Sequence, residues 1–364
     1  MNDVEELKQY VGAHARAQSM PPGHFEKLLD RIRTDDEGAA GSWAREWYEA
    51  GERLEEAGQY LEACRHFNMA RFPYVDGPAR GAALERCVNA FDRWRKETGG
   101  IDRLDLDLPG GRVGCWTSGL SRHERRPLLV FMGGIVSIKE QWAPLLTRLD
   151  RLGFAGLVTE LPGVGENTLT YGADSRHLLP QLLDAVADVA DVTRTYCITL
   201  SFSGHLAMLA ALEEPRIRGI MTVGAPVHDF FTDRAWQAQV PRITVDTLAH
   251  LTGVPAADVG EHIRDWAVSD RQLAGLSVPL AYAASTRDEI IPAGDPRRLR
   301  RHVRDLRIVE YDDVHGAPHH LPEMQLWGFL SILRMKGGHY LPRTVLRYAH
   351  LAHRTRRRLA ARRA

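Results

Sequence analysis

A serine stands between an apolar run and a helix-forming run near the middle of the chain. The segment Thr199-Leu200-Ser201-Phe202-Ser203-Gly204 follows the apolar residues Tyr196-Cys197-Ile198 and precedes a helical run from Leu206. A strand, a sharp turn and a helix in this order hold a serine hydroxyl exposed, where an imidazole can take its proton and the next backbone N–H can meet a developing oxyanion. We therefore expect Ser201 to be a nucleophile and the N–H of Phe202 to be an oxyanion donor.

The residues around this serine depart from the usual pattern of such a turn. Glycine is usual two residues before and two residues after the nucleophile, because side chains there collide across the turn. Thr199 and Ser203 stand at these two places, and Ser203 is itself the rival nucleophile. The small residues Gly204 and Ala207 fit the expected spacing only if Ser201 is the nucleophile.

An acid and a histidine follow the serine in the chain order serine, acid, histidine. Asp288 comes just after the apolar run 280–284, and His315 follows the next apolar run, 307–311. In such a triad the imidazole acts as general base and the carboxylate orients it, so we assign these roles to His315 and Asp288. The alternatives that stay open are Glu289 for the acid and His319, with His320 beside it, for the base.

Further candidates follow other apolar runs. Met132-Gly133-Gly134-Ile135 is a glycine-rich turn directly after a predicted strand, and it predicts the second oxyanion donor in the N–H of Gly134 or Ile135. Glu166 and His228 also follow predicted strands. Ligands of mostly parallel sheets bind at the carboxyl ends of the strands, so we predict that both contact substrate, with a structural cap or ion pair as the alternative.

The elements that must position these residues change character near residue 101. Earlier residues show helical periodicity only, with apolar stripes over 43–70 and 83–94. Later residues show short apolar runs, most of them separated by helical stretches, which predicts a mostly parallel sheet with helices on both faces. The predicted strands are 103–108, 112–117, 127–132, 155–159, 195–199, 219–223, 280–284 and 307–311. We expect a helical domain over 1–100, an α/β domain over 101–337 with an inserted helical lid over 226–276, and a basic terminal helix or tail over 338–364.

Composition limits the classes of protein and the kinds of partner that we expect. The 364 residues include 47 Lys+Arg and 47 Asp+Glu, so the charge balance gives no reason to expect nucleic acid as a partner. The chain begins with an acidic segment and has no uncharged apolar run of 18 residues, so we expect a soluble cytoplasmic protein without membrane contact. Cys64, Cys87, Cys115 and Cys197 are far apart in the sequence, and we expect reduced thiols, no metal site and no cofactor.

Together these residues resemble the FrsA-like branch of the α/β-hydrolase superfamily, which includes esterase-like proteins and carbon–carbon hydrolases typified by 2,6-dihydroxypseudooxynicotine hydrolase. The resemblance runs from about Trp43 to Leu333. The motifs that carry it are Gly133-Gly134-Ile135-Val136-Ser137-Ile138-Lys139-Glu140, Leu161-Pro162-Gly163-Val164-Gly165-Glu166, the turn at Ser201, Glu214-Pro215-Arg216, Gly224-Ala225-Pro226-Val227-His228 and Gln239-Val240-Pro241.

The resemblance implies an α/β-hydrolase fold with an N-terminal helical lid, a Ser201-Asp288-His315 triad, no metal and often a dimer. Glu166 matches the position of a glutamate that the carbon–carbon hydrolases use in substrate handling. Glu160 departs from the family, which often has Asp at this place.

Three hypotheses for function follow. The leading one is an intracellular serine hydrolase that acts on an ester, thioester or activated ketone of a bulky secondary metabolite such as a polyketide. The second is a lyase of the same fold that eliminates acetate from an O-acetylated tetronate-type intermediate, with His315 as the base and no acyl-enzyme. The third is a binding module that has kept the fold without catalysis. The partners expected are a small-molecule substrate and, by the resemblance, a second copy of the chain.

Overall fold

The computed structural model describes residues 2–338, so the expected basic tail lies outside the described residues, apart from Gly338. The strands are β1 (Asp102–Leu108), β2 (Gly111–Ser118), β3 (Pro127–Met132), β4 (Ala155–Thr159), β5 (Asp191–Leu200), β6 (Ile217–Val223), β7 (Leu280–Ser285) and β8 (Leu306–Tyr311). The longer α-helices are α1 (Val4–Ala17), α2 (Pro22–Leu29), α3 (Trp43–Glu56), α4 (Tyr60–Arg71), α5 (Pro78–Thr98), α7 (Leu178–Val186), α8 (Phe202–Ala211), α11 (Arg242–Thr252), α14 (Gly294–His302) and α15 (Leu321–Lys336). The shorter α-helices are α6 (Lys139–Trp142), α9 (Asp229–Thr232), α10 (Arg234–Gln237), α12 (Val259–His262) and α13 (Asp270–Gly275), and the 3-10 helices are η1 (Ala143–Arg148), η2 (Asp150–Leu152), η3 (Ala173–His177), η4 (Arg264–Trp266) and η5 (Pro318–His320).

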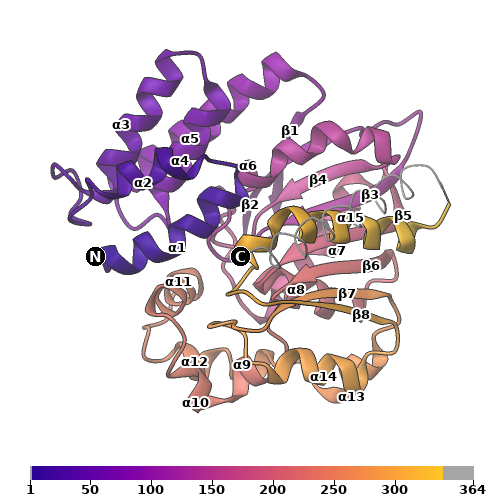
Figure 1. Cartoon of the computed structure of the whole chain (residues 1–364). Helices are drawn as coiled ribbons and strands as arrows, with labels where there is room; N and C mark the ends of the chain where they lie inside the picture. The colour runs from indigo at the N-terminus through magenta and orange to yellow at the C-terminus, as the bar shows by residue number, and fades with distance from the viewer. Residues whose placement is uncertain (1, 339–364) are drawn as a thin grey trace, which may run out of the picture.

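All eight predicted strands join one sheet in the order β1-β2-β4-β3-β5-β6-β7-β8 (Figure 1). The hairpin of β1 and β2 is antiparallel, and β2 runs antiparallel to β4, whereas every pairing from β4 to β8 is parallel. The parallel strands therefore end at one edge, where their carboxyl ends gather the loops that follow them.

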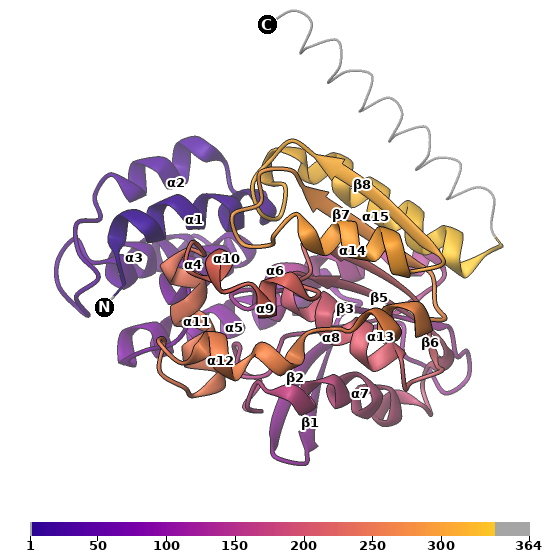
Figure 2. The same cartoon turned by 90° about the horizontal axis from the view of Figure 1, so that it is seen from below.

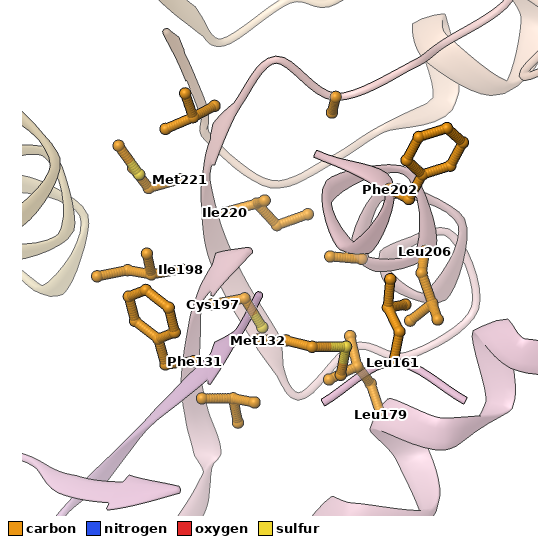
Figure 3. Close-up of a cluster of buried hydrophobic side chains, with 14 of the residues drawn as sticks. Phe131, Met132, Leu161, Leu179, Cys197, Ile198, Phe202, Leu206, Ile220 and Met221 are labelled. Atoms are coloured by element: carbon orange, nitrogen blue, oxygen red, sulfur yellow. The ribbon is translucent and has the colours of Figure 1, made fainter. Parts of the chain in front are cut away.

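Helices cover both faces of this sheet (Figures 1 and 2). Successive side chains of a strand point to opposite faces, and Figure 3 shows this alternation on β3, β5 and β6. Phe131, Ile198 and Met221 point to one face, and Met132, Cys197 and Ile220 point to the other, toward Leu206 of α8. Both sets are almost fully buried, so the central strands read as continuous apolar runs.

The N-terminal helices α1 to α5 form a layer with its own apolar core beside the sheet (Figure 1). Trp43 and Trp47 of α3 are fully buried in this core, with ring centroids 6.2 Å apart. Helices α3 to α5 carry the apolar stripes identified in the sequence. The sequence analysis did not predict α1 and α2 as separate helices. Cys64 and Cys87, distant in sequence, bring their Sγ atoms to 3.5 Å between α4 and α5.

Helices α9 to α13 lie in the long connection between β6 and β7, and α11 among them lies next to the N-terminal helix α1 (Figures 1 and 2). The backbone N–H of Ile243 in α11 donates to Glu6 of α1 at 3.2 Å, which ties the two helical segments together. None of the helices within residues 2–338 has the length and apolar character that crossing a membrane requires.

Helix α8 meets β6 at Gly204, and this contact generates a prediction. A Cβ atom at Gly204 would lie 2.0 Å from the Thr222 Oγ1 atom and 2.7 Å from the Ala225 Cβ atom. Thr222 is a β-branched residue fixed in the sheet, so Gly204→Ala is expected to lower the free energy of unfolding by about 1–3 kcal/mol through overpacking. Urea denaturation measures this change. Gly275→Ala is the matched control, because nothing lies within 4 Å of its new Cβ, and an equal loss in both variants contradicts the prediction.

Candidate active site

Ser201 occupies the sharp turn between β5 and α8. Its φ of 56° and ψ of −126° are a strained combination for a residue with a side chain. Two backbone hydrogen bonds hold this conformation: the N–H of Ser201 donates to the carbonyl of Val223 at 2.8 Å, and the N–H of Gly204 donates to the carbonyl of Ser201 at 2.8 Å. The turn therefore projects the Ser201 side chain from the carboxyl edge of the sheet.

The rival Ser203 faces the interior. Its side chain is fully buried, and its Oγ atom lies 2.9 Å from the carbonyl oxygens of both Met132 and Leu200. The hydroxyl thus links α8 to the ends of β3 and β5 through hydrogen bonds. The turn and the sheet approach each other closely at Gly204 instead. This explains why Thr199 and Ser203 can stand where glycine was expected.

The structure brings Ser201, His315 and Asp288 together from three separate loops. The Ser201 Oγ atom lies 3.1 Å from the His315 Nε2 atom, and the His315 Nδ1 atom lies 3.0 Å from both carboxylate oxygens of Asp288. The backbone N–H groups of Ile290 and Ile291 donate to Asp288 Oδ1 at 3.0 and 2.8 Å. These contacts fix the carboxylate and, through it, the ring.

The remaining acid and base candidates have other partners. Glu289 accepts the backbone N–H of His315 at 3.0 Å, so it holds the loop and not the ring. His319 and His320 both direct their Nδ1 atoms to Asp313, at 2.9 and 3.0 Å. Asp313 therefore fixes the end of the loop that carries His315.

The imidazole reaches the serine across the end of β6, which lies between β5 and β7 in the sheet. Gly224 follows β6 with a φ of 55°. A Cβ atom there would lie 2.8 Å from the His315 Cε1 atom and 3.5 Å from Asp288 Oδ2. Glycine at this position thus leaves the space through which the His315 ring approaches Ser201.

The electrostatic surroundings of His315 suit a base. Burial alone would lower the pKa of this imidazole, but the Asp288 carboxylate and then Glu289 raise it, and the net pKa is above the ordinary value of 6.5. The side chain is 17% exposed and that of Asp288 is 5% exposed. The attraction between ring and carboxylate is therefore only weakly screened by water.

The expected oxyanion residues lie beside the serine. Phe202 is the first residue of α8, so its N–H is among those that find no acceptor within the helix. Gly134 follows β3 and lies close to the turn at Ser201. A Cβ atom at Gly134 would lie 3.1 Å from the Ser201 Cβ atom. Ile135 comes next and is buried. The loop after β3 and the start of α8 thus border the same atom, Ser201 Oγ.

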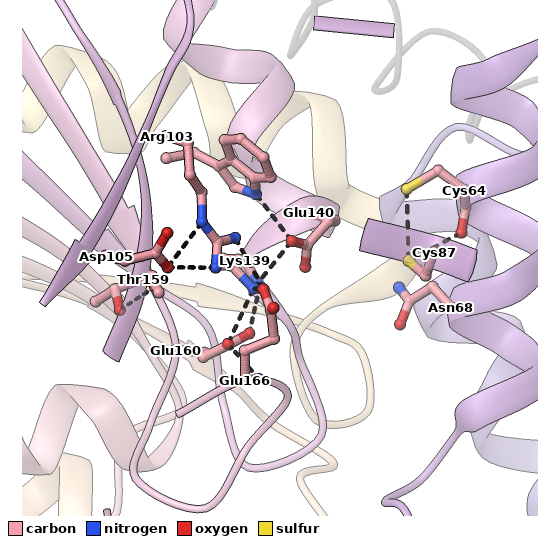
Figure 4. Close-up of polar contacts among 12 residues, drawn as sticks. Cys64, Asn68, Cys87, Arg103, Asp105, Lys139, Glu140, Thr159, Glu160 and Glu166 are labelled. Carbon is pink, nitrogen blue, oxygen red and sulfur yellow. Dashed lines mark hydrogen bonds and ion pairs between the residues drawn. The ribbon is translucent and has the colours of Figure 1, made fainter. Parts of the chain in front are cut away.

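Glu166 belongs to a buried charged cluster around Lys139 (Figure 4). Its carboxylate accepts from Lys139 Nζ at 2.6 Å and from Arg103 Nη1 at 2.8 Å. Glu160 accepts the backbone N–H groups of Lys139 and Glu166 at 2.9 and 2.8 Å. The cluster therefore joins the loop after β3 to the loop after β4, and the substrate role predicted for Glu166 stays a prediction.

Burial and charge set the protonation of this cluster. Burial lowers the pKa of Lys139, but Glu140, Glu160 and Glu166 more than reverse this, and the net pKa is raised. Burial raises the pKa of Glu160 to about 7 despite the opposing effect of Lys139. The ammonium ion thus balances carboxylates that have little contact with water.

His228 also lies at the carboxyl edge, at the start of α9. Its backbone N–H donates to Asp295 Oδ1 at 2.9 Å, and its ring Nδ1 atom lies 3.2 Å from the carbonyl oxygen of Val268. Asp295 also accepts the N–H groups of Val227 and Asp229, at 2.9 and 2.7 Å. The His228 backbone therefore has a structural use, and its substrate contact stays a prediction.

Helix α1 packs against η5, which follows His315 in the chain, and the sequence analysis singled out none of its residues. Burial and then Glu289 raise the pKa of Tyr10, and burial, then Arg71 and His315, lower the pKa of His14 to about 3. No motif marks either residue. The available signal was their i, i+4 spacing, which places both on one helix face.

The fold and this site together define the α/β-hydrolase class. The chain matches the family model described as "Esterase FrsA-like" over residues 39–275, and it belongs to that family. The expected fold class and family are confirmed.

Individual relatives agree with this placement. The chain is 27% identical over 274 residues to Esterase FrsA of Vibrio cholerae serotype O1, a match that covers 66% of each protein and thus just under two thirds of that esterase. It is 22% identical over 346 residues to Esterase FrsA of Photobacterium profundum, covering 83% of this chain and 82% of that one. Among solved structures, AbyA5 wild type is 55% identical with a TM-score of 0.94, covering 96% of this chain and 99% of that chain. The 2,6-dihydroxy-pseudo-oxynicotine hydrolase has a TM-score of 0.69 at 17% identity, covering 88% of this chain and 96% of that chain, and shares the fold.

The charged cluster generates a stability prediction. Lys139→Met removes the ammonium ion and leaves its buried carboxylates without that partner, so the free energy of unfolding is expected to fall by about 3 kcal/mol or more. Urea denaturation at neutral pH measures the loss. Lys96→Met is the control, because this lysine is 64% exposed in its ion pair with Asp92 and such pairs contribute about 0–1 kcal/mol. Similar values for the two variants would show that the cluster is not stabilising.

Proposed function

We propose that the protein is a serine hydrolase that cleaves an ester or thioester of a bulky, largely apolar acyl compound. The observation that carries this proposal is the hydrogen-bonded chain from Ser201 Oγ through His315 to Asp288, with both links at 3.0–3.1 Å. Membership of the FrsA-like esterase family supports the same reaction class.

The proposed reaction assigns one role to each group. His315 Nε2 takes the proton of Ser201 Oγ as the oxygen attacks the carbonyl carbon, and Asp288 stabilises the imidazolium that forms. The N–H groups of Phe202 and of Gly134 or Ile135 stabilise the oxyanion, each donor being worth about 3 kcal/mol. His315 then protonates the leaving group, and water hydrolyses the acyl-enzyme with His315 again as base.

A cavity lined mainly by apolar side chains supports the choice of a bulky acyl group. It has a volume of about 230 Å³ and lies among the helices between β6 and β7. Phe230, Val245, Leu248 and Ile263 line it, together with the polar side chains of Arg234 and Gln237. The Phe230 ring packs against the ring of Phe202, with centroids 5.2 Å apart, directly after the proposed nucleophile. Phe230 thus links this cavity to the turn that carries Ser201. A polyketide is one compound class that meets this description.

The nucleophile is tested by Ser201→Ala. Loss of the hydroxyl should reduce kcat/KM for p-nitrophenyl esters by about 10³-fold or more and abolish labelling by a fluorophosphonate. Ser203→Ala is the matched control and should keep labelling, because the Ser203 hydroxyl faces the interior. Unchanged turnover and labelling in the Ser201 variant would refute the mechanism, and absence of labelling in the wild type would favour a non-catalytic binding module.

The pH dependence tests the base. His315 must be neutral to accept a proton, so kcat/KM should rise with pH through a pKa above 6.5. Asp288→Asn removes the carboxylate that raises this pKa, so the acid limb should move to lower pH and the rate should fall by about 10⁴-fold. Asp312→Asn is the control, since this neighbouring aspartate is 82% exposed. An acid limb that stays in place in the Asp288 variant would assign the titration to another group.

A second candidate reaction is elimination of a carboxylate such as acetate. The low exposure of the His315 side chain, 17%, favours it, because elimination needs a base and an anion site but no attacking water. In that reaction His315 abstracts a proton from carbon, and the oxyanion donors hold the departing carboxylate. Turnover in ¹⁸O-labelled water distinguishes the two reactions, since hydrolysis places the label in a product and elimination does not.

A further inference from the structure

Arg71, the last residue of α4, carries a buried positive charge whose hydrogen-bond partners are neutral. The residue is 2% exposed. Its Nε atom donates to the Asn68 Oδ1 atom at 3.0 Å, its Nη1 atom to the carbonyl of Pro73 at 2.9 Å, and its Nη2 atom to the carbonyl of Val136. Burial lowers the pKa of the guanidinium to about 10, so it stays charged at neutral pH. Burying a charge among neutral acceptors is costly, so we expect the charge to have a function.

Arg80 shows the usual arrangement in the same helical layer. Its guanidinium, also buried, donates to Asp35 Oδ1 at 2.6 Å and to Asp76 Oδ1 at 2.9 Å. Carboxylates therefore balance the charge of Arg80, whereas Arg71 directs its charge to the loop after β3.

Val136, the third acceptor of Arg71, lies in the turn that borders the nucleophile. Its side chain packs against the apolar core of the N-terminal layer. The N–H of Ser137 donates to the carbonyl of Gly134 at 3.0 Å, which closes a turn with Ile135 and Val136 at its centre. Gly134 adjoins Ser201, as the short distance from its added Cβ shows. The helical layer thus holds the same turn that supplies the candidate oxyanion donors.

These contacts form one chain of polar groups, because each peptide unit joins a carbonyl to the N–H of the next residue. Arg71 Nη2 donates to the carbonyl of Val136, and the same peptide unit contains the Ser137 N–H. That N–H donates to the carbonyl of Gly134, whose peptide unit contains the Ile135 N–H. Within residues 2–338 the Ile135 N–H has no acceptor. Hydrogen bonds in such a chain polarise one another, so a positive charge at its start strengthens the donor at its end.

We propose that Arg71 is a positioning residue of the oxyanion site, which orients and polarises the Ile135 N–H through two peptide units and so makes Ile135 the second oxyanion donor. The inference rests on the proposed function of the triad and goes beyond it, because it gives the N-terminal helical layer a part in stabilising the transition state. A purely structural link between this layer and the sheet would need only a neutral donor, whose burial costs less than that of a guanidinium.

Arg71→Met tests this role in the hydrolysis of p-nitrophenyl butanoate. The change removes the charge and its donors, so the Ile135 N–H becomes a weaker and less fixed donor. We expect kcat to fall by about ten- to a hundredfold, less than or equal to the usual loss for complete removal of an oxyanion donor. KM should change little, because the interaction is made in the transition state. Arg71→Lys keeps the charge and should recover part of kcat.

A phosphonyl group on Ser201 gives a readout that a loss of stability alone does not move. After labelling with a fluorophosphonate, the phosphonyl oxygen takes the place of the oxyanion, so its ³¹P NMR resonance reports the hydrogen bonds that it accepts. The resonance should move in Arg71→Met and return toward its wild-type position in Arg71→Lys. Asn68→Asp is a second variant that keeps Arg71 in place. Its carboxylate would compensate the guanidinium charge at the 3.0 Å contact, so kcat should fall and the resonance should move as in Arg71→Met.

Arg80→Met is the matched control, because it removes the other buried guanidinium of the layer and leaves Asp35 without that partner. It should lower the free energy of unfolding but leave kcat and the ³¹P resonance unchanged. An unmoved resonance with wild-type kcat in Arg71→Met, or equal losses of kcat in Arg71→Met and Arg80→Met, would overturn the role of Arg71 and leave the triad in place. If the wild-type protein is not labelled, the proposed function fails and this inference fails with it.

Discussion

The strained backbone of Ser201 is the constraint around which the site is built. A positive φ on a residue with a side chain costs about 1–3 kcal/mol and persists only where the surroundings over-determine it. Here the carbonyl of Val223 and the N–H of Gly204 hold the turn from both sides. Gly204 lets α8 press directly against β6, and the helix starts immediately after the serine, so the N–H groups of its first turn, which have no acceptor within the helix, lie next to Ser201.

The sequence predicted the sheet and the meeting of Ser201, Asp288 and His315 because both depend on local signals. Short apolar runs bounded by turns marked every strand, and polar residues just after those runs, Ser201, Asp288 and His315, met at the carboxyl edge. The choice between neighbours needed coordinates. Side-chain direction at a turn depends on packing, and only the structure shows Ser203 bonded to the Met132 and Leu200 carbonyls and His319 bonded to Asp313.

The packing of the first helix could not be predicted from motifs. Glu6 of α1 accepts the backbone N–H of Ile243, 237 positions further along the chain, and this contact exists only because the fold brings the two segments together. The same holds for Glu166, whose place after β4 suggested contact with substrate and whose observed partners are Lys139 and Arg103. Long-range charge pairing is decided by topology, which periodicity does not encode.

The glycine after β6 has a consequence for how the site of this protein is assembled. Ser201 and His315 follow β5 and β8, which β6 and β7 separate in the sheet, and the His315 ring approaches Ser201 past Gly224 at the end of β6. One added methyl group there would leave the sheet, the turn and the three reactive residues intact while keeping them apart. A relative with a larger residue at this position would keep the serine, the acid and the histidine and still hold the imidazole away from the serine hydroxyl.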